Sequence, residues 1–261
     1  MLLSPRQNQI LDIARDNGRV TVDDLAAQFQ VTPQTIRKDL NELCELRQLT
    51  RVHGGALFPS GNENVEYESR RLIAAAEKLA IGQAAARLIP DNASLFINIG
   101  TTTEAFADSL RDHTGLMVIT NNINVANRLR MRPDFETIIA GGVVRQSDGG
   151  IVGEAAVDFI RQFKVDFAVI GVSAIDDDGA LLDYDFREVK VAQAIMANAR
   201  HVILVSDSTK FERTAPVRIG HVSQIDTFVT DRVPSPDFAR ICVEGEVRLI
   251  EVLRGAGNGE S

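Results

Sequence analysis

Short polar segments recur in the second half of the chain, each directly after an apolar run. They combine glycine, small hydroxyl and amide side chains, and two cations: Gly100, Thr101, Thr102, Thr103, Asn121, Asn122, Gly141, Gly142, Arg145, Ser173 and Lys210. Glycine lets an anion approach the backbone, and hydroxyl and N–H groups at the start of a helix donate hydrogen bonds to it. With the positive charges of Arg145 and Lys210, this pattern predicts a site for a phosphorylated small molecule.

Other chemistry for these segments stays open at this point. The threonines at 101–103 could do no more than cap the next helix, because hydroxyl residues are common at that position. Lys210 could form a Schiff base or transfer protons, although the sequence shows no partner for a catalytic pair. We expect Lys210 to bind phosphate, and we expect no catalytic residue and no cofactor.

The histidines and one acidic run do not indicate a metal site. His53, His113, His201 and His221 are scattered and lack the paired spacing of metal ligands. The acidic run at 176–178 precedes a glycine and resembles part of a calcium loop. The first-ligand position of that pattern is Ala174, which cannot coordinate through its side chain. We therefore predict a turn there and no metal ion.

Buried strands must position the polar segments. Continuous apolar runs lie at residues 95–99, 117–119, 137–140, 167–170, 202–205 and 227–229, helical stretches separate most of them, and a last strand is expected at 247–252. A continuous apolar run indicates a strand buried on both faces, as in a largely parallel α/β sheet. Ligands bind such sheets at the carboxyl ends of the strands, which is where the polar segments lie.

A second set of residues that could bind a partner lies near the N-terminus. Thr32 suits an N-cap and Pro33 the first helical position, while Ile36, Leu40 and Leu43 share one apolar face of a helix. The residues that could contact DNA are Thr32, Gln34, Thr35, Arg37, Lys38 and Asn41. Such a helix can read base edges in the major groove. A solvated amphipathic helix has the same pattern, so the neighbouring elements must decide.

Two helical patterns precede this helix, and a basic hairpin follows it. Residues 4–7 form a capping box with proline at the first helical position, and a second helix opens at Thr21. Residues 48–55 alternate, are basic and stop at two glycines. They predict the β-wing of a winged helix-turn-helix domain, with Arg51 and His53 on one strand face where they could contact phosphates.

The charge distribution supports this interpretation, although the net charge of −8 argues weakly against nucleic-acid binding. Residues 1–56 carry seven basic and seven acidic side chains, so the whole negative excess lies beyond them. DNA affinity depends on the local basic patch, which lies within 32–53. The chain has no membrane-span-length apolar run, no signal-peptide pattern and only Cys44 and Cys242, so we expect a cytoplasmic protein.

The motifs together resemble the DeoR family of bacterial repressors. The resemblance lies in residues 35–40 (Thr-Ile-Arg-Lys-Asp-Leu), 51–56 (Arg-Val-His-Gly-Gly-Ala), 99–102 (Ile-Gly-Thr-Thr), 120–122 (Thr-Asn-Asn) and 148–155 (Asp-Gly-Gly-Ile-Val-Gly-Glu-Ala). It implies an N-terminal winged helix-turn-helix domain at 1–57 and a sugar-phosphate-binding α/β sensor domain at 76–254, similar in fold to ribose-5-phosphate isomerase. A linker and the start of a connecting helix, expected over 69–89, would fill 58–75, and a disordered tail would occupy 255–261.

The resemblance also implies a function. The chain would bind operator DNA as a homodimer or homotetramer and repress a carbohydrate or glycerol catabolic operon. A phosphorylated effector, glycerol 3-phosphate before other sugar phosphates, would release it. One departure is Asn98, where the similar repressors tend to have aspartate, and this leaves the effector's identity open. The operator, the regulated genes and the choice between induction and co-repression stay open too.

The alternative is an enzyme, a sugar-phosphate isomerase that carries an accessory DNA-binding domain. Such isomerases have an acidic cluster after the strand predicted at 167–170, whereas residues 172–174 here are valine, serine and alanine. Asp183, Asp185 and Glu188 keep this alternative open, because a catalytic base can come from another loop.

Overall fold

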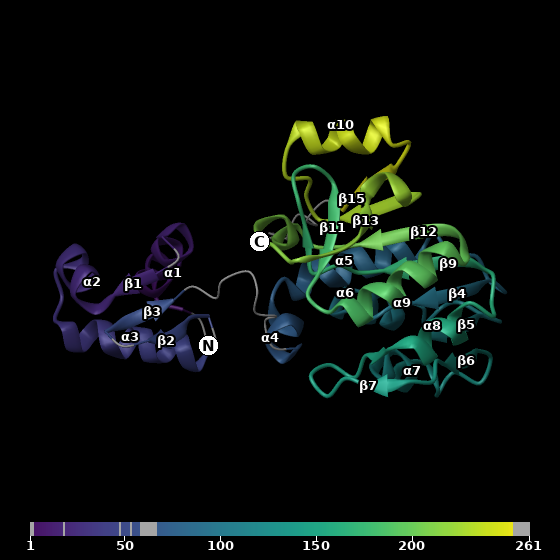
Figure 1. Ribbon diagram of the computed structural model, residues 1–261, viewed down its shortest axis with the longest axis horizontal. Helices are drawn as coiled ribbons and strands as arrows, with labels where there is room; N and C mark the ends of the chain where they lie inside the picture. The colour runs from purple at the N-terminus through teal and green to yellow at the C-terminus, as the bar shows by residue number, and fades with distance from the viewer. Residues whose placement is uncertain (1–2, 18, 47, 53, 58–66, 253–261) are drawn as a thin grey trace, which may run out of the picture. The chain divides into compact units, whose positions relative to one another are not determined.

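The structure, a computed structural model, describes residues 3–17, 19–46, 48–52, 54–57 and 67–252 of the 261-residue chain. Its contacts divide the chain into two compact units, residues 1–65 and 66–261 (Figure 1). The division falls inside the segment 58–75 that the sequence predicts as a linker. Residues 58–66 and the predicted tail at 255–261 lie outside the described residues, so those two expectations stay predictions.

The N-terminal unit is the predicted winged helix-turn-helix. Its helices are α1 (Pro5–Asn17), α2 (Val22–Phe29) and α3 (Pro33–Glu45), and its strands β1 (Arg19–Thr21), β2 (Thr50–Val52) and β3 (Gly55–Leu57) form an antiparallel sheet in the order β1-β3-β2. The predicted apolar face of α3 is fully buried through Ile36, Leu40 and Leu43. The sequence does not predict β1, because three residues are too few to show a period.

Local side-chain bonds start these helices where the sequence predicts. The Ser4 N–H donates to Gln7 Oε1 at 2.8 Å and the Gln7 N–H to Ser4 Oγ at 3.2 Å, which is a capping box. Thr21 caps α2, and Thr32 Oγ1 caps α3 by accepting the Thr35 N–H at 3.3 Å. Gln30 turns the chain between α2 and α3 with a left-handed φ of 53°.

The larger unit is built on a seven-stranded parallel sheet in the order β15-β14-β12-β9-β4-β5-β6. Its strands are β4 (Ser94–Ile97), β5 (Met117–Thr120), β6 (Glu136–Ile139), β9 (Val165–Ile170), β12 (Ala199–Val205), β14 (Thr227–Thr230) and β15 (Arg248–Glu251). Six of these strands overlap the six predicted apolar runs, and β15 lies within the last predicted strand, 247–252. The prediction of a largely parallel α/β sheet is therefore confirmed.

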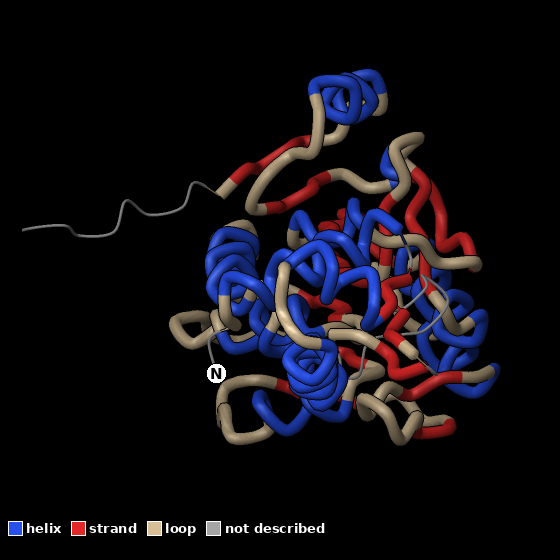
Figure 2. The backbone as a smooth tube through the Cα atoms, turned by 90° about the vertical axis from the view of Figure 1, so that its left-hand side faces the viewer, coloured by secondary structure: helices blue, strands red, loops and turns tan. Residues whose placement is uncertain are grey.

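Helices cover both faces of this sheet (Figure 2). In β4, Leu95 and Ile97 enter the core on one face, whereas Phe96 enters the core on the other. The first core contains α5 (Ala75–Ala86), α6 (Thr101–Asp108) and α7 (Ile123–Leu129), and the second contains α8 (Glu154–Ile160), α9 (Phe186–Ala197) and α10 (Pro236–Glu244). Two buried faces explain why the strand sequences are continuously apolar.

Several smaller elements complete this unit, and the sequence does not predict them. They are the antiparallel pair β7 (Val143–Val144) and β8 (Ile151–Val152), the sheet β10 (Ala174–Ile175), β11 (Ala180–Asp183) and β13 (Val217–His221), and the 3₁₀ helices η1 (Ser208–Glu212) and η2 (Val222–Gln224). Most of these elements are too short for a sequence pattern to indicate them.

The prediction of one helix over 69–89 is wrong. The chain forms α4 (Tyr67–Leu72) and α5, which begins at Ala75, and Ala74 between them has a left-handed φ of 51°. A buried side chain explains the break. The Lys78 ammonium donates to the carbonyl oxygens of Ile73, at 2.6 Å, and of Arg70. These carbonyl groups satisfy the buried lysine instead of continuing a helix into α5.

Candidate functional site

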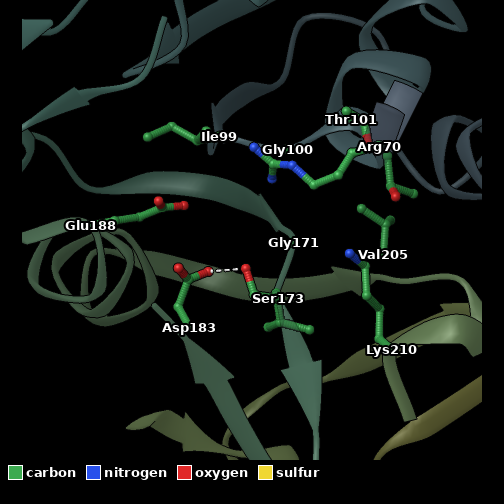
Figure 3. A pocket seen from close by; sticks show the side chains of 12 residues that line it. Arg70, Ile99, Gly100, Thr101, Gly171, Ser173, Asp183, Glu188, Val205 and Lys210 are labelled. Atoms are coloured by element: carbon green, nitrogen blue, oxygen red, sulfur yellow. Dashed lines mark hydrogen bonds between the residues drawn. The ribbon is translucent and has the colours of Figure 1, made fainter. Parts of the chain in front are cut away.

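A pocket that is partly open to solvent lies at the carboxyl ends of the neighbouring strands β4, β9 and β12. Figure 3 shows the side chains around it. The lining residues come from these strand ends and from α4, α6, α9, β11 and η1: Arg70, Ile99, Gly100, Thr101, Thr102, Gly171, Val172, Ser173, Asp183, Glu188, Val205 and Lys210. Five of the eleven predicted effector-binding residues therefore meet here: Gly100, Thr101, Thr102, Ser173 and Lys210.

The loop after β4 presents backbone to the cavity. Gly100, which immediately precedes α6, has a φ of 151°, a conformation that other residues rarely adopt. No side chain caps α6. The Thr103 hydroxyl instead donates to the carbonyl oxygens of Asn98 and Gly100, at 2.8 Å each, and this fixes the loop from behind. Uncapped N–H groups at the start of a helix attract an anion.

Lys210 supplies a cation with no counter-ion in contact. Its side chain points into the cavity (Figure 3), and the residue is only 8% exposed. Its ammonium has no hydrogen-bond or ion-pair partner in the part of the chain that the structure describes. The pKa of Lys210 falls to about 7, first through burial and then through the positive charge of Arg213, although Asp207 opposes both effects.

Carboxylates line another side of the cavity. The Ser173 hydroxyl donates to Asp183 Oδ2 at 2.9 Å. Glu188 Oε2 lies 2.5 Å from Arg145 Nη2. Burial and then the charge of Asp183 raise the pKa of Glu188 to about 8, although Arg145 favours its charged form. The cavity is therefore cationic at Lys210 and Arg70 and rich in hydrogen-bond acceptors at Asp183 and Glu188, which suits a ligand with an anionic group and hydroxyl groups.

The structure does not bring the other six predicted residues to this cavity. Besides Thr103, they are Asn121, Asn122, Gly141, Gly142 and Arg145. Asn121 donates to the Ile151 carbonyl at 3.1 Å, and Asn122 caps α7 at 2.9 Å. A Cβ on Gly142 would lie 2.9 Å from Ile151, whereas one on Gly141 would meet open space.

Arg145 is held by acidic neighbours rather than by the cavity. It forms a two-bond ion pair with Asp148, Nε to Oδ1 at 2.8 Å and Nη2 to Oδ2 at 2.6 Å, and it also contacts Glu188. Burial lowers the pKa of Arg145, but the hydrogen bonds and charges of Asp148 and Glu188 outweigh burial and keep this pKa above its usual value. The charge of Arg145 is thus already compensated, so this arrangement does not support the prediction that Arg145 binds phosphate.

Arg70 is a charged lining residue that the sequence analysis does not mention. It comes from α4, which precedes the first strand of the sheet, and its side chain points into the cavity (Figure 3). An arginine in a short polar helix has no periodicity or motif that would identify it. Only the packing of α4 on the unit reveals its place.

The predicted DNA-contacting residues of α3 lie on its outer face. Thr32, Gln34, Arg37, Lys38 and Asn41 are exposed, and Thr35, half-buried, shares a 2.9 Å hydrogen bond with the Thr32 hydroxyl. Arg51 belongs to β2, but its side chain is not described, and His53 lies outside the described residues. A helix buried on one face and donor-rich on the other can enter a major groove.

The histidines described have structural partners. His113 Nε2 lies 3.0 Å from the carbonyl oxygens of Ala86 and Ile89, and His201 Nε2 lies 2.9 Å from Thr227 Oγ1. Within the described ranges, no group of three or more His, Cys, Asp or Glu is arranged to hold a metal ion. The same ranges contain no helix long and apolar enough to cross a membrane.

Solved structures similar to this chain share only low sequence identity with it. Ribose 5-phosphate isomerase A from Methanocaldococcus jannaschii is 14% identical, with a TM-score of 0.39 over 53% of this chain and 55% of that one. The eIF2B beta subunit from Chaetomium thermophilum is 16% identical, with a TM-score of 0.46 over 66% of this chain and 54% of that one.

Sequence relatives are much more similar. The glycerol-3-phosphate regulon repressor of Escherichia coli (strain K12) is 44% identical over 95% of this chain and 99% of its own length. The repressor of the same name from Haemophilus influenzae is 47% identical over 90% of this chain and 91% of its own length. Residues 6–62 match the DeoR-like helix-turn-helix domain, and residues 73–232 match the DeoR C-terminal sensor domain. The chain therefore belongs to the DeoR family.

Proposed function

We propose that this protein is a transcriptional repressor that binds operator DNA through α3 and is released by a small phosphorylated effector. Its two domains are those of the DeoR family, and its relatives are named as repressors. The protein acts in the cytoplasm, where the DNA is, and as a homodimer it would read two half-sites. Effector binding shifts the protein toward a state with lower operator affinity.

One observation carries the effector proposal. The partnerless ammonium of Lys210 faces the same cavity as Gly100 and the uncapped start of α6. A buried charge without a partner is unfavourable, and a bound phosphate would supply the missing counter-charge. Thr101 and Thr102 lie at the same place and offer hydroxyl donors.

Glycerol 3-phosphate is the effector that we propose. The relatives at 44% and 47% identity are named for the glycerol-3-phosphate regulon. Its phosphate would lie at Lys210 and Gly100, and its hydroxyl groups would donate to Asp183 and Glu188. Asn98, the departure from the similar repressors, is fully buried, and its Oδ1 accepts the Ile99 N–H at 2.7 Å. It is not among the residues that line the cavity, so its effect on the effector would be indirect.

The isomerase alternative finds less support. A catalytic base must be free to take a proton from the substrate. Asp183 already accepts the Ser173 hydroxyl and the Tyr184 N–H, and Glu188 is paired with Arg145. We therefore expect no turnover of ribose 5-phosphate or glyceraldehyde 3-phosphate, measured as aldose–ketose conversion.

The direct test is a gel shift on DNA from upstream of this protein's own gene. We expect saturating glycerol 3-phosphate to lower operator affinity by about 5- to 150-fold, the usual range of allosteric coupling. Glycerol, which lacks the phosphate, should have no effect. The Lys210→Met variant should need about tenfold more effector or higher, because it loses a charge-assisted bond. If no sugar phosphate releases the wild-type protein from the DNA, the effector proposal is refuted.

A further inference from the structure

The short helix α4 is the first described element after the N-terminal unit, and it reaches the effector cavity. In the order of the chain, this helix is where the polypeptide coming from the DNA-binding domain enters the sensor domain. Its Arg70 lines the cavity together with Lys210 and the loop at Gly100 (Figure 3). The helix that leads to the DNA-binding domain thus contributes directly to the ligand site.

Side-chain contacts hold α4 in place at both ends. At its start, the Tyr67 hydroxyl donates to Glu104 Oε2 at 2.7 Å and accepts from Asn124 Nδ2 at 3.0 Å. At its end, Lys78 binds the carbonyl oxygens of Arg70 and Ile73. A helix of six residues is too short to be stable alone, so its position depends on such contacts.

Arg70 has donor capacity left for a ligand. Its Nη2 lies 3.1 Å from Asp148 Oδ2, an oxygen that Arg145 also contacts, at the shorter distance of 2.6 Å. The side chain of Arg70 is only 11% exposed. Its Nε–H is buried and has no hydrogen-bond partner among the described residues. An unpaired buried N–H is unfavourable, and a phosphate oxygen would satisfy it.

We propose that Arg70 binds the phosphate of the effector and that α4 thereby senses occupancy of the site. In the empty state Arg70 shares Asp148 with Arg145. In the bound state Arg70 pairs with the phosphate, and Asp148 stays with Arg145. This inference rests on the proposed function, because it assigns the contact through which effector binding reaches the DNA-binding domain.

The break between α4 and α5 makes such a response possible. Ala74 has a left-handed φ of 51°, which costs a non-glycine residue energy. Because α4 is not continuous with α5, a change in the partner of Arg70 can alter α4 without bending a long helix. A ligand shifts an equilibrium only through a contact that differs between the two states, and Arg70 supplies that contact.

The test compares Arg70→Met with Arg71→Met, the same change at the neighbouring exposed position of the same helix. Glycerol 3-phosphate affinity is measured by calorimetry, and operator affinity by fluorescence anisotropy with and without effector. Arg70→Met should lower effector affinity about tenfold or more and Arg71→Met about twofold or less. Arg70→Lys should restore affinity only in part, because an ammonium lacks the planar fork of arginine.

A second variant separates sensing from binding. Tyr67→Phe removes the hydroxyl that anchors α4 but substitutes no residue that lines the cavity. It should bind glycerol 3-phosphate within about threefold of wild type while losing most of the effector-dependent release from DNA, since coupling and affinity are distinct quantities. A purely structural role of Tyr67 would change both properties together or neither, and either result would overturn the sensing role of α4.

Hydrogen exchange in the wild-type protein tests the inference without a substitution. Saturating glycerol 3-phosphate should slow amide exchange across residues 67–74 by about fivefold or more, because it adds contacts to α4. Unchanged exchange there, or wild-type affinity in Arg70→Met, would overturn the role of Arg70 while the proposed repressor function stands. If wild-type protein neither binds effector nor leaves DNA, both proposals fail.

Discussion

At the scale of single residues, burial changes what a side chain can do. Lys210 and Arg145 are both cations predicted for phosphate binding, but their surroundings separate them. Arg145 is compensated by Asp148, whereas Lys210 has no hydrogen-bond or ion-pair partner among the described residues. Only a cation that lacks a counter-ion gains substantially from an incoming anion.

Proton uptake should accompany effector binding. The pKa of Lys210 is about 7 in the free protein, so at pH 8 the side chain is mostly neutral. A phosphate favours the charged form and raises this pKa. Binding at pH 8 should therefore take up close to one proton, and affinity should fall as pH rises above 7.

Calorimetry in buffers with different ionisation enthalpies measures this uptake. The Lys210→Met variant is the control and should take up almost none. Binding enthalpies of the wild-type protein that do not depend on the buffer at pH 8 would contradict the assignment.

On the DNA side, Arg37 is the residue whose loss should matter most clearly. It is exposed on α3, and it has no hydrogen-bond or ion-pair partner among the residues that the structure describes. We expect Arg37→Ala to weaken operator binding by about 1–3 kcal/mol without lowering thermal stability. Arg161→Ala, an exposed arginine of the other unit, serves as the control. Equal operator affinity of both variants at matched salt would exclude Arg37 from the interface.

At the scale of elements, the position of α6 determines the geometry of the cavity. This helix begins beside Gly100 and packs tightly against α5 at Gly82. A Cβ on Gly82 would lie 2.7 Å from the carbonyl carbon and oxygen of Ala105. The two helices can approach this closely only because residue 82 has no side chain.

Gly82→Ala should therefore destabilise the protein, although alanine is the better helix former by about 1 kcal/mol. Overpacking against a backbone costs about 1–3 kcal/mol, and moving α6 would also weaken effector binding. Urea denaturation measures the change, with Gly141→Ala as the control, because a Cβ at Gly141 meets open space. A Gly82→Ala protein as stable as wild type would show that α5 and α6 are not in such close contact.

At the scale of the whole molecule, the two ligands must affect one another equally. If glycerol 3-phosphate lowers operator affinity by a given factor, operator DNA must lower effector affinity by the same factor. Titrating effector into the protein with and without saturating operator duplex measures that factor independently of the gel shift. Unequal factors would show that a further equilibrium, such as a change of oligomeric state, takes part.

The amino-acid sequence by itself determined the elements that depend on neighbouring residues. Capping at Ser4, Thr21 and Thr32 started the three N-terminal helices, and continuous apolar runs marked six of the seven parallel strands. These signals act over a few residues, so they can be read locally. They also placed polar segments at strand ends, and five of the proposed binding residues meet in one cavity for that reason.

Only the tertiary structure decided which polar side chains share the site. Arg70 lines the site from α4, and Asp183 and Glu188 line it from β11 and α9. Arg145 does not line the site and instead pairs with Asp148. The break at Ala74 likewise depends on where Lys78 finds its acceptors. Burial and ion pairing set the available charge, and both follow from contacts between elements distant in sequence, which local patterns do not contain.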